Sequence, residues 1–168
     1  MVGKYPLLAR VFHWLSASVI IWALASGFMV AAGALPSALG KLISPFNASI
    51  TTLLIPVFIL RLLYRLSFTA PSLPLPPRQR QVARGAHALI YGVALFSMAS
   101  GVLMMERNIE IFGWFSFPSP LAKGELTKLI SRLHFSSNFI LLLLLVLHVL
   151  AVVKHHREGF PVLKRMSW

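Results

Sequence analysis

The chain has 168 residues, of which 57% are hydrophobic and only 12% are charged, and its formal net charge is +12. Soluble domains contain about 45–50% apolar and about 25% charged residues, so this composition indicates an integral membrane protein. Cysteine and aspartate are absent, which excludes disulfides, thiolate metal ligands, covalently attached c-type haem and paired-aspartate catalysis. In so apolar a chain, the positive charge predicts loops that face anionic lipid and the cytoplasm, with no nucleic acid as a partner.

Four apolar stretches are each long enough to cross the bilayer, because about 20 helical residues span about 30 Å of hydrocarbon. The stretches cover residues 8–33, 46–66, 82–105 and 126–156. We therefore predict an all-α fold, an integral membrane four-helix bundle in which residues 1–168 form one transmembrane domain. Pro56 lies inside the second stretch and predicts a kink there, which neighbouring helices can tolerate.

The basic residues are distributed unequally between the two sides of the predicted bundle. Lys and Arg dominate both chain ends and the proline-rich connection of residues 69–84, whereas the connection after the third helix holds three of the four Glu. Because basic excess marks the cytoplasmic side, we expect both termini and the proline-rich connection in the cytoplasm. An even number of membrane spans agrees with this placement.

Four of the six histidines lie in or at the edge of the apolar helices: His13, His87, His134 and His148. An ionisable side chain inside a membrane is costly, so each marks a candidate functional site. His134 and His148 are 14 residues apart on the fourth helix, which puts them on roughly one face and about 21 Å apart along the axis. One nitrogen ligand near each membrane face suits two stacked redox cofactors or an electron path, and does not suit one zinc site.

The helix directions sort the possible partners by depth. His13, His87 and His148 share a level near the cytoplasmic face, whereas His134 lies near the opposite face without a histidine at its level. Haem held by two imidazoles from different helices explains such a pair in a thiol-free bundle. A proton relay is the alternative, but relays usually recruit Asp or Glu, which these helices almost lack. His155 follows at the membrane edge, within an interfacial basic cluster.

Two arginines lie on the second helix at a spacing that places them on one face. Arg61 and Arg65 are four residues apart, so their side chains are neighbours on the helix surface. They could pair with haem propionates or a quinone headgroup. Alternatively, they reach out to anionic lipid.

Several short motifs occur in a characteristic order. They are F-H-W-L at residues 12–15, R-L-L-Y-R at 61–65, A-H-A-L-I-Y at 86–91 and F-G-W-F at 112–115. In this order on four helices, they resemble the bacterial cytochrome b561 family of the inner membrane. The resemblance implies two b-type haems, each held by two histidines, and electron exchange with a quinone such as ubiquinone. One branch of the family oxidises superoxide.

The resemblance also implies roles for individual residues. His13 and His148 correspond to the ligands of the cytoplasmic-side haem, and His134 corresponds to one ligand of the haem at the opposite face. His87 matches a position that faces a quinone or propionate. Because quinone carbonyls need hydrogen-bond donors and reduction needs protons, we predict a quinone site near His87 and His155.

The sequence departs from the family pattern at Asn47, where the family has the second ligand of the far haem. An amide is a poor ligand for haem iron, so we expect one bis-histidine haem rather than two. Three alternatives remain open for the second haem: it is lost, it is held by His134 alone with an open sixth position, or another residue replaces the missing ligand.

The leading functional hypothesis is a haem b electron-transfer protein that exchanges electrons with membrane quinone. A superoxide:quinone oxidoreductase is a possible enzymatic form of it, since basic residues of the third connection could steer an anion inward: Arg107, Lys123, Lys128 and Arg132. One alternative is a cytochrome b subunit that docks on a partner oxidoreductase. Another is a haem-free transporter or assembly factor.

Overall fold

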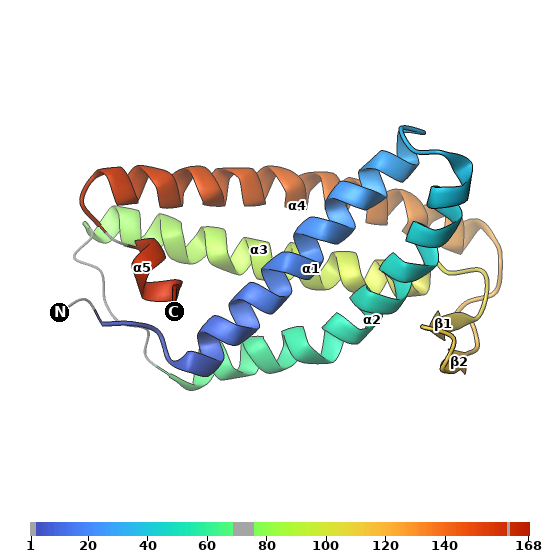
Figure 1. The fold of residues 1–168 in the computed structure, drawn as a ribbon, viewed down its shortest axis with the longest axis horizontal. Coiled ribbons are helices and arrows are strands. Elements are labelled where there is room, and N and C mark those ends of the chain that lie inside the picture. Colours follow the sequence, from blue (N-terminus) through green and yellow to red (C-terminus); the bar gives the residue numbers. More distant parts are fainter. Residues whose placement is uncertain (1–2, 69–75, 161) are drawn as a thin grey trace.

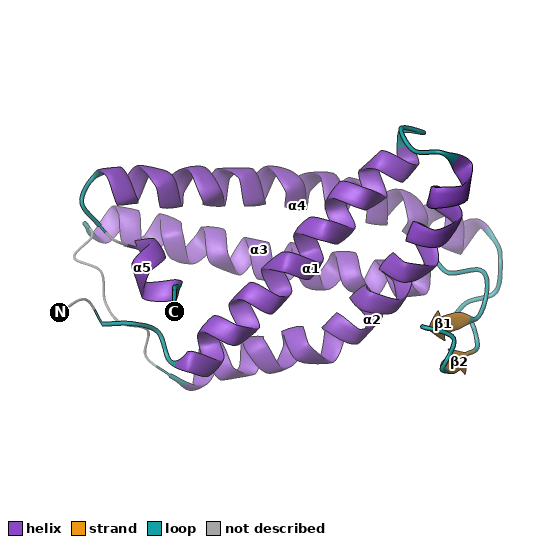
Figure 2. Cartoon of the chain, viewed as in Figure 1, coloured by secondary structure: helices purple, strands orange, loops and turns teal. Residues whose placement is uncertain are grey.

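The structure is a computed structural model that describes residues 3–68, 76–160 and 162–168. In chain order its elements are α1 (Leu7–Ala31), α2 (Ser37–Ser67), α3 (Pro77–Leu103), β1 (Ile109–Ile111), β2 (Phe115–Phe117), α4 (Glu125–Arg157) and α5 (Val162–Met166) (Figure 1). The four long helices are each long and apolar enough to cross a membrane. The predicted all-α membrane bundle is confirmed, and the only strands in the described residues form one small hairpin (Figure 2).

Helices α2 and α3 begin well before the apolar stretches that predicted them. Helix α2 begins at Ser37 rather than near residue 46, directly after Pro36, and α3 begins at Pro77 rather than near residue 82. Proline suits the first turn of a helix because its missing N–H has no partner there. Hydropathy marks the membrane-embedded part of a helix, so it misses polar turns outside the bilayer. Residues 69–75 of the proline-rich connection lie outside the described residues, and residues 77–84 form the start of α3.

The four long helices pack as two antiparallel pairs, α1 on α2 and α3 on α4, and α2 against α3 joins the pairs (Figure 1). Helix α2 holds Pro45 and Pro56 in its interior, and its two halves run in different directions in Figure 1. The apolar core draws on all four helices: Val19, Leu24, Leu54, Phe58, Ala94, Met98 and Leu141. Much other apolar surface faces outward, as a lipid-embedded protein requires.

Small polar residues occupy much of the remaining interior. Six serines are buried: Ser16, Ser26, Ser49, Ser97, Ser100 and Ser137. Several donate to a carbonyl of the preceding turn of their own helix, as Ser16 Oγ does to the Phe12 carbonyl at 2.7 Å. Their small size lets helix backbones approach, and the local bonds satisfy their hydroxyls without water.

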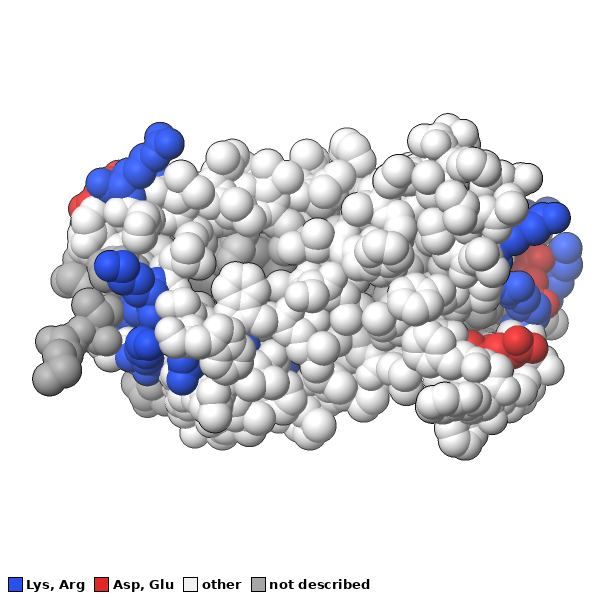
Figure 3. All heavy atoms as spheres, in the orientation of Figure 1, with Lys and Arg blue, Asp and Glu red and all other residues white. Residues whose placement is uncertain are grey.

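The charged side chains visible in Figure 3 gather at the two ends of the long axis, with a broad, nearly uncharged band between them. Both chain termini, the end of α2 and the start of α3 lie at one of these ends (Figure 1). Helix α5 ties the termini together there, because Trp14 Nε1 donates to the Met166 carbonyl at 2.8 Å. Arg10 Nη1 likewise donates to the Ser167 carbonyl at 2.8 Å.

Candidate functional site

Each of the four long helices contributes one basic or imidazole side chain to a cluster at the end of the bundle that holds the termini. We call this end the histidine end, and its cluster consists of His13 on α1, Arg61 on α2, His87 on α3 and His148 on α4. His13 interacts electrostatically with the other three. The structure therefore brings together the three histidines that helix direction placed at one depth.

Arg61 binds His13 and is enclosed by aromatic rings. Its Nη2 donates a hydrogen bond to His13 Nδ1 at 3.0 Å. Its guanidinium lies 5.1 Å from the ring centre of Tyr91 and 5.4 Å from that of Phe58. Cation–π contacts of this kind stabilise a partly buried guanidinium. No carboxylate of the described residues forms an ion pair with Arg61, so a fixed positive charge lies beside His13.

The other two histidines of the cluster contact each other edge to face. The ring centres of His87 and His148 are 5.3 Å apart and the rings are nearly perpendicular, at 78°. His87 is exposed. Its Nδ1 lies 2.6 Å from the Ala83 carbonyl and therefore donates to it, so Nε2 is the nitrogen that remains for a ligand. His13 and His148 are both partly buried. The cluster thus has two enclosed imidazoles and one at its rim.

His134 lies near the opposite end, and protein groups engage both of its ring nitrogens. Its Nδ1 donates to the Ser97 carbonyl at 2.9 Å, and its Nε2 accepts from Asn138 Nδ2 at 2.9 Å. Ser97 Oγ closes the network by donating to Asn138 Oδ1. This network joins α3 to α4 and leaves the ring of His134 without a free nitrogen.

The ring of His134 also lies directly against the backbone of α3. A Cβ added at Gly101 would meet His134 Cε1 at 3.0 Å, closer than side chains normally approach. Glycine at this position is therefore what allows the imidazole to press on the neighbouring helix. The position of His134 depends on α3 as much as on α4.

Asn47 on α2 is part of a second network at the same end, which we call the asparagine end after Asn47 and His134. Trp22 Nε1 donates to Asn47 Oδ1 at 3.0 Å, and Asn47 Nδ2 donates to Ser26 Oγ at 2.8 Å. Ser26 Oγ in turn donates to the Trp22 carbonyl at 2.7 Å. The amide of Asn47 therefore joins α2 to α1 through two hydrogen bonds.

The other residues singled out by sequence lie outside the histidine cluster. Arg65 is exposed, and its guanidinium lies 5.5 Å from the ring centre of Phe68. His155 lies 3.4 Å from a carboxylate oxygen of Glu158, one turn further along the chain. Of the two arginines predicted to share a role, only Arg61 reaches the cluster.

Several residues that shape these sites were not identified from the sequence. Tyr91 and Phe58 enclose Arg61, and Trp22 and Asn138 complete the two networks of the asparagine end. A signal for Tyr91 was present, since it follows His87 by four residues and so shares its helix face. Nothing in the sequence indicated Trp22, because the rotation of α1 against α2 decides its partner.

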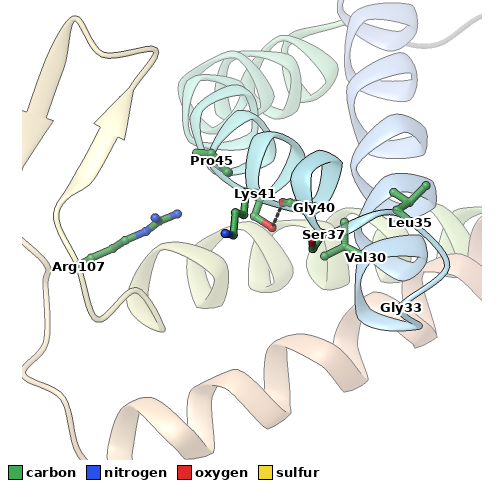
Figure 4. Close-up of a pocket in the computed structure, with 9 residues that line it drawn as sticks. Val30, Gly33, Leu35, Ser37, Gly40, Lys41, Pro45 and Arg107 are labelled. Atoms are coloured by element: carbon green, nitrogen blue, oxygen red, sulfur yellow. Dashed lines mark hydrogen bonds between the residues drawn. The ribbon is translucent and has the colours of Figure 1, made fainter.

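The basic residues beyond the asparagine end differ in their partners. Lys123 pairs with Glu106 at 3.1 Å and Lys128 pairs with Glu125 at 2.7 Å. Lys41 and Arg107 instead line an open cavity of about 600 Å³ at the turn between α1 and α2, where Figure 4 shows them extending toward each other. Glu106 also accepts from Thr127 Oγ1 at 3.1 Å, so it clips the end of α3 to the start of α4.

Comparison with known proteins decides the family. The family model for prokaryotic cytochrome b561 matches residues 4–168. The chain belongs to the prokaryotic cytochrome b561 family. It is 31% identical over 172 residues to "Cytochrome b561 homolog 2" of Escherichia coli (strain K12), a match that covers 97% of this chain and 90% of that protein. Family membership makes this cytochrome b561 a multi-pass bacterial membrane protein of haem b electron transfer.

The two ends of this cytochrome differ in their fitness for haem. The histidine end offers two partly buried imidazoles on different helices and a partly buried cation, the donor set that suits a bis-histidine haem and its acidic propionates. The asparagine end does not fit a bis-histidine haem, because the nitrogens of His134 and the amide of Asn47 are bonded to protein. Among the described residues, no three His, Asp or Glu converge to hold a metal ion by themselves.

Proposed function

We propose that this chain is a quinone-linked electron-transfer cytochrome that uses one bis-histidine haem b at its histidine end. The observation that carries the proposal is the convergence of His13, Arg61, His87 and His148 from four helices. His13 and His148 are the residues that would hold the haem iron, because both are partly buried and they lie on helices of opposite pairs. His87 is exposed, which disfavours it as the ligand that competes for the same iron.

Haem supplies reversible one-electron transfer when it is bound, and the protein sets its ligation, surroundings and access. Iron ligation through Nε2 requires a proton on Nδ1 of His13, and a guanidinium cannot accept a hydrogen bond. With haem held through Nε2 of His13, Arg61 would therefore pair with an acidic group instead of with His13. The propionates are the acidic groups that haem b brings, so Arg61 is positioned to pair with them.

His87 is the residue we assign to the quinone. It lies at the exposed rim of the cluster, in ring contact with His148, so a headgroup beside it would be close to the electron carrier. Complete reduction of a quinone takes two electrons and two protons, and an imidazole at the membrane edge can supply protons from water. His155 with Glu158 forms a second proton-carrying pair at the same edge.

The charge distribution supports one orientation in the membrane. The histidine end carries the chain termini with their Lys and Arg, and the asparagine end carries Glu106, Glu110 and Glu125. We place the histidine end at the cytoplasmic face, where basic excess accumulates. The quinone site is then on the cytoplasmic side.

The asparagine end does not favour a superoxide-oxidising activity. It would need an electron acceptor near the asparagine end, where the ligand positions are bonded to protein. Two of the four cations considered for steering an anion, Lys123 and Lys128, are also paired with glutamates. The arrangement favours electron exchange confined to one face of the membrane.

The experiment is stopped-flow oxidation of the dithionite-reduced holoprotein by a ubiquinone analogue in vesicles. His87→Ala is expected to slow the oxidation at least about tenfold while the low-spin haem spectrum is retained, because the donor to the quinone is lost. His156→Ala, an exposed histidine one residue from His155, is the matched control and keeps the wild-type rate. An unchanged rate in His87→Ala contradicts the quinone assignment.

A further inference from the structure

The β1–β2 hairpin has one apolar face and one polar face. Its register pairs Ile109 with Phe117 and Ile111 with Phe115, so these four side chains share one side of the ribbon. Glu110 and Ser116 pair on the other side. Ile109 is only 6% exposed, on the strand that contacts α2, whereas Phe115 on β2 is 61% exposed. The apolar face therefore continues outward past the bundle instead of closing onto it.

The turn presents a further aromatic side chain. Phe112 and Gly113 both have positive φ angles, 50° and 74°, and Trp114 N–H donates to the Ile111 carbonyl at 2.9 Å. Two consecutive left-handed residues form the tight turn that matches the twist of a hairpin. A phenylalanine rarely adopts this conformation, so neighbouring contacts must hold it. At the end of the turn, Trp114 is 82% exposed.

Helix α2 supplies those contacts. Ser49 Oγ accepts from Phe112 N–H at 3.1 Å, and its single proton is shared between the Glu110 carbonyl and the Pro45 carbonyl of α2, each at 2.9 Å. The ring centre of Phe112 lies 5.7 Å from that of Phe46. The serine itself is 3% exposed. The buried hydroxyl of Ser49 thus contacts the hairpin backbone at two points and attaches the hairpin to α2.

The attachment point lies at the depth expected for a membrane boundary. Arg65 is exposed near the end of α2, and 20 residues of helix, which rise about 30 Å, lead back from it to residue 45. Phe46 and Ser49 lie one and four residues after residue 45, within the first turn inside this boundary. A hairpin attached there lies beside the bundle at the level of the far lipid headgroups, and Figure 1 shows it at the side of α2 at that end.

Two cations, Lys41 and Arg107, lie near the hairpin (Figure 4). Lys41 lies one turn before Pro45 on α2, and Arg107 lies two residues before β1. Both line the open cavity of Figure 4, and neither forms an ion pair with an acidic residue of the described chain. Positive side chains just outside an aromatic level are the arrangement that anionic lipid phosphates attract.

We propose that the β1–β2 hairpin is a lipid-interface anchor, with its aromatic face among the upper acyl chains and its polar face toward water. Trp114 then lies at the headgroup level, where an indole has both an apolar and a hydrogen-bonding surround. Lys41 and Arg107 lie beside the lipid phosphates. The anchor fixes the depth of the first half of α2, and with it the level of Asn47.

The test uses spin labels on adjacent residues of opposite faces, since the chain has no cysteine of its own. Holoprotein variants Phe115→Cys and Ser116→Cys are labelled in phosphatidylethanolamine–phosphatidylglycerol vesicles. Collision with oxygen, which concentrates in lipid, is compared with collision with a water-soluble nickel chelate. Leu143→Cys on α4 and Lys123→Cys, whose side chains are 50% and 77% exposed, calibrate lipid and water.

We expect the label at Phe115 to resemble that at Leu143, and the label at Ser116 to resemble that at Lys123. Nickel accessibility at both hairpin positions would overturn the proposal, because the hairpin would lie in water. Exclusion of both reagents from both positions would also overturn it, because a protein partner or a second copy would cover the hairpin.

A second pair of variants tests how the anchor is held. Ser49→Ala removes the hydroxyl that binds the hairpin, and Ser44→Ala is its matched control. Ser44 also lies on α2 and donates only to the carbonyl of Gly40, four residues earlier. In the Phe115→Cys background, Ser49→Ala should move the label toward the nickel-accessible range, and Ser44→Ala should not. Equal profiles for the two alanine variants contradict the role given to Ser49.

Discussion

The two ends of this bundle carry similar residue types and use them differently. At the histidine end, imidazoles lie beside a partly buried guanidinium and beside each other, and Arg61 has no ion pair with an acidic residue of the described chain. At the asparagine end, each polar atom of His134 and Asn47 that could bind a ligand is bonded to the protein: His134 Nε2 to Asn138 of its own helix, and the other three atoms to a neighbouring helix. A histidine in a membrane helix therefore indicates a cofactor only when its second nitrogen and its opposite partner are also considered.

The difference has an energetic basis. A polar group in a low-dielectric interior is costly unless it is bonded, and a closed network removes that cost. The networks of the asparagine end are closed within the protein. The guanidinium at the histidine end is held by ring faces and one imidazole, and a partly buried charge of this kind is best compensated by an anion. The haem propionates are such anions.

The largest expected effect is the loss of haem in His148→Ala. Removing one of two axial ligands from a bis-histidine site abolishes the low-spin absorption spectrum of the purified protein. His134→Ala is the matched control on the same helix, and it should keep that spectrum while losing about 1–2 kcal/mol of stability through the broken hydrogen bonds. A full low-spin spectrum in His148→Ala would show that His148 is not a ligand.

The next effect is a gain of haem in Asn47→His. The substitution adds an imidazole on α2 at the end that holds His134, and it removes the hydrogen bonds to Trp22 and Ser26. We expect the haem content to rise from about one toward about two per chain, with a second low-spin signal. Asn47→Ala removes the same bonds without adding a ligand and should leave the content unchanged. An increase in the alanine variant would mean that the network alone excludes haem.

A smaller effect concerns the charge of Arg61. Removing a positive charge near the iron favours the oxidised state, so Arg61→Gln should lower the midpoint potential by an amount on the order of tens of millivolts. Arg65→Gln, one turn away but exposed, should shift the potential much less because water screens its charge. Redox titration followed by absorbance measures both. Equal shifts would place Arg61 outside the haem environment.

The smallest effect is a pH dependence of stability at Glu106, which pairs with Lys123 and Thr127 and so joins the end of α3 to the start of α4. The hydrogen bond from Lys123 is the main cause that holds the pKa of the Glu106 carboxyl below its ordinary value of 4.5. Because the pKa of Glu106 is lowered in the folded state, its interactions with Lys123 and Thr127 contribute stability above about pH 4.5. This contribution is lost as the pH falls through the folded-state pKa. Thermal unfolding in detergent should show this loss in wild type and not in Glu106→Gln. The same acid sensitivity in both proteins would contradict it.

Much of the fold could be predicted from the sequence, because long apolar runs leave a membrane helix as the only way to satisfy the backbone. The shared depth of His13 and His148 followed from helix direction alone. The hairpin was missed because strands of three residues carry no detectable alternation, and the F-G-W-F segment contains only one glycine to indicate a turn. Helix α5 was missed because five residues give no periodicity.

The contacts within the site were harder to predict from the sequence. Depth along a helix is fixed by residue number, whereas the direction of a side chain around the helix depends on packing against neighbours. For this reason the sequence grouped Arg61 with Arg65, although only Arg61 faces His13. Asn47 was recognised as an unsuitable ligand, but its bonds to Trp22 and Ser26 depend on how α1 crosses α2.

The contrast between the two ends is tested most directly by the haem content of the unmodified protein. Haem is quantified as its pyridine complex against protein from amino-acid analysis, and electron paramagnetic resonance reports the spin state of the oxidised iron. The account predicts one haem per chain with a single low-spin signal, from His13 and His148. Two low-spin signals and two haems per chain would contradict it, because the asparagine end would then hold a bis-ligated haem despite its closed networks.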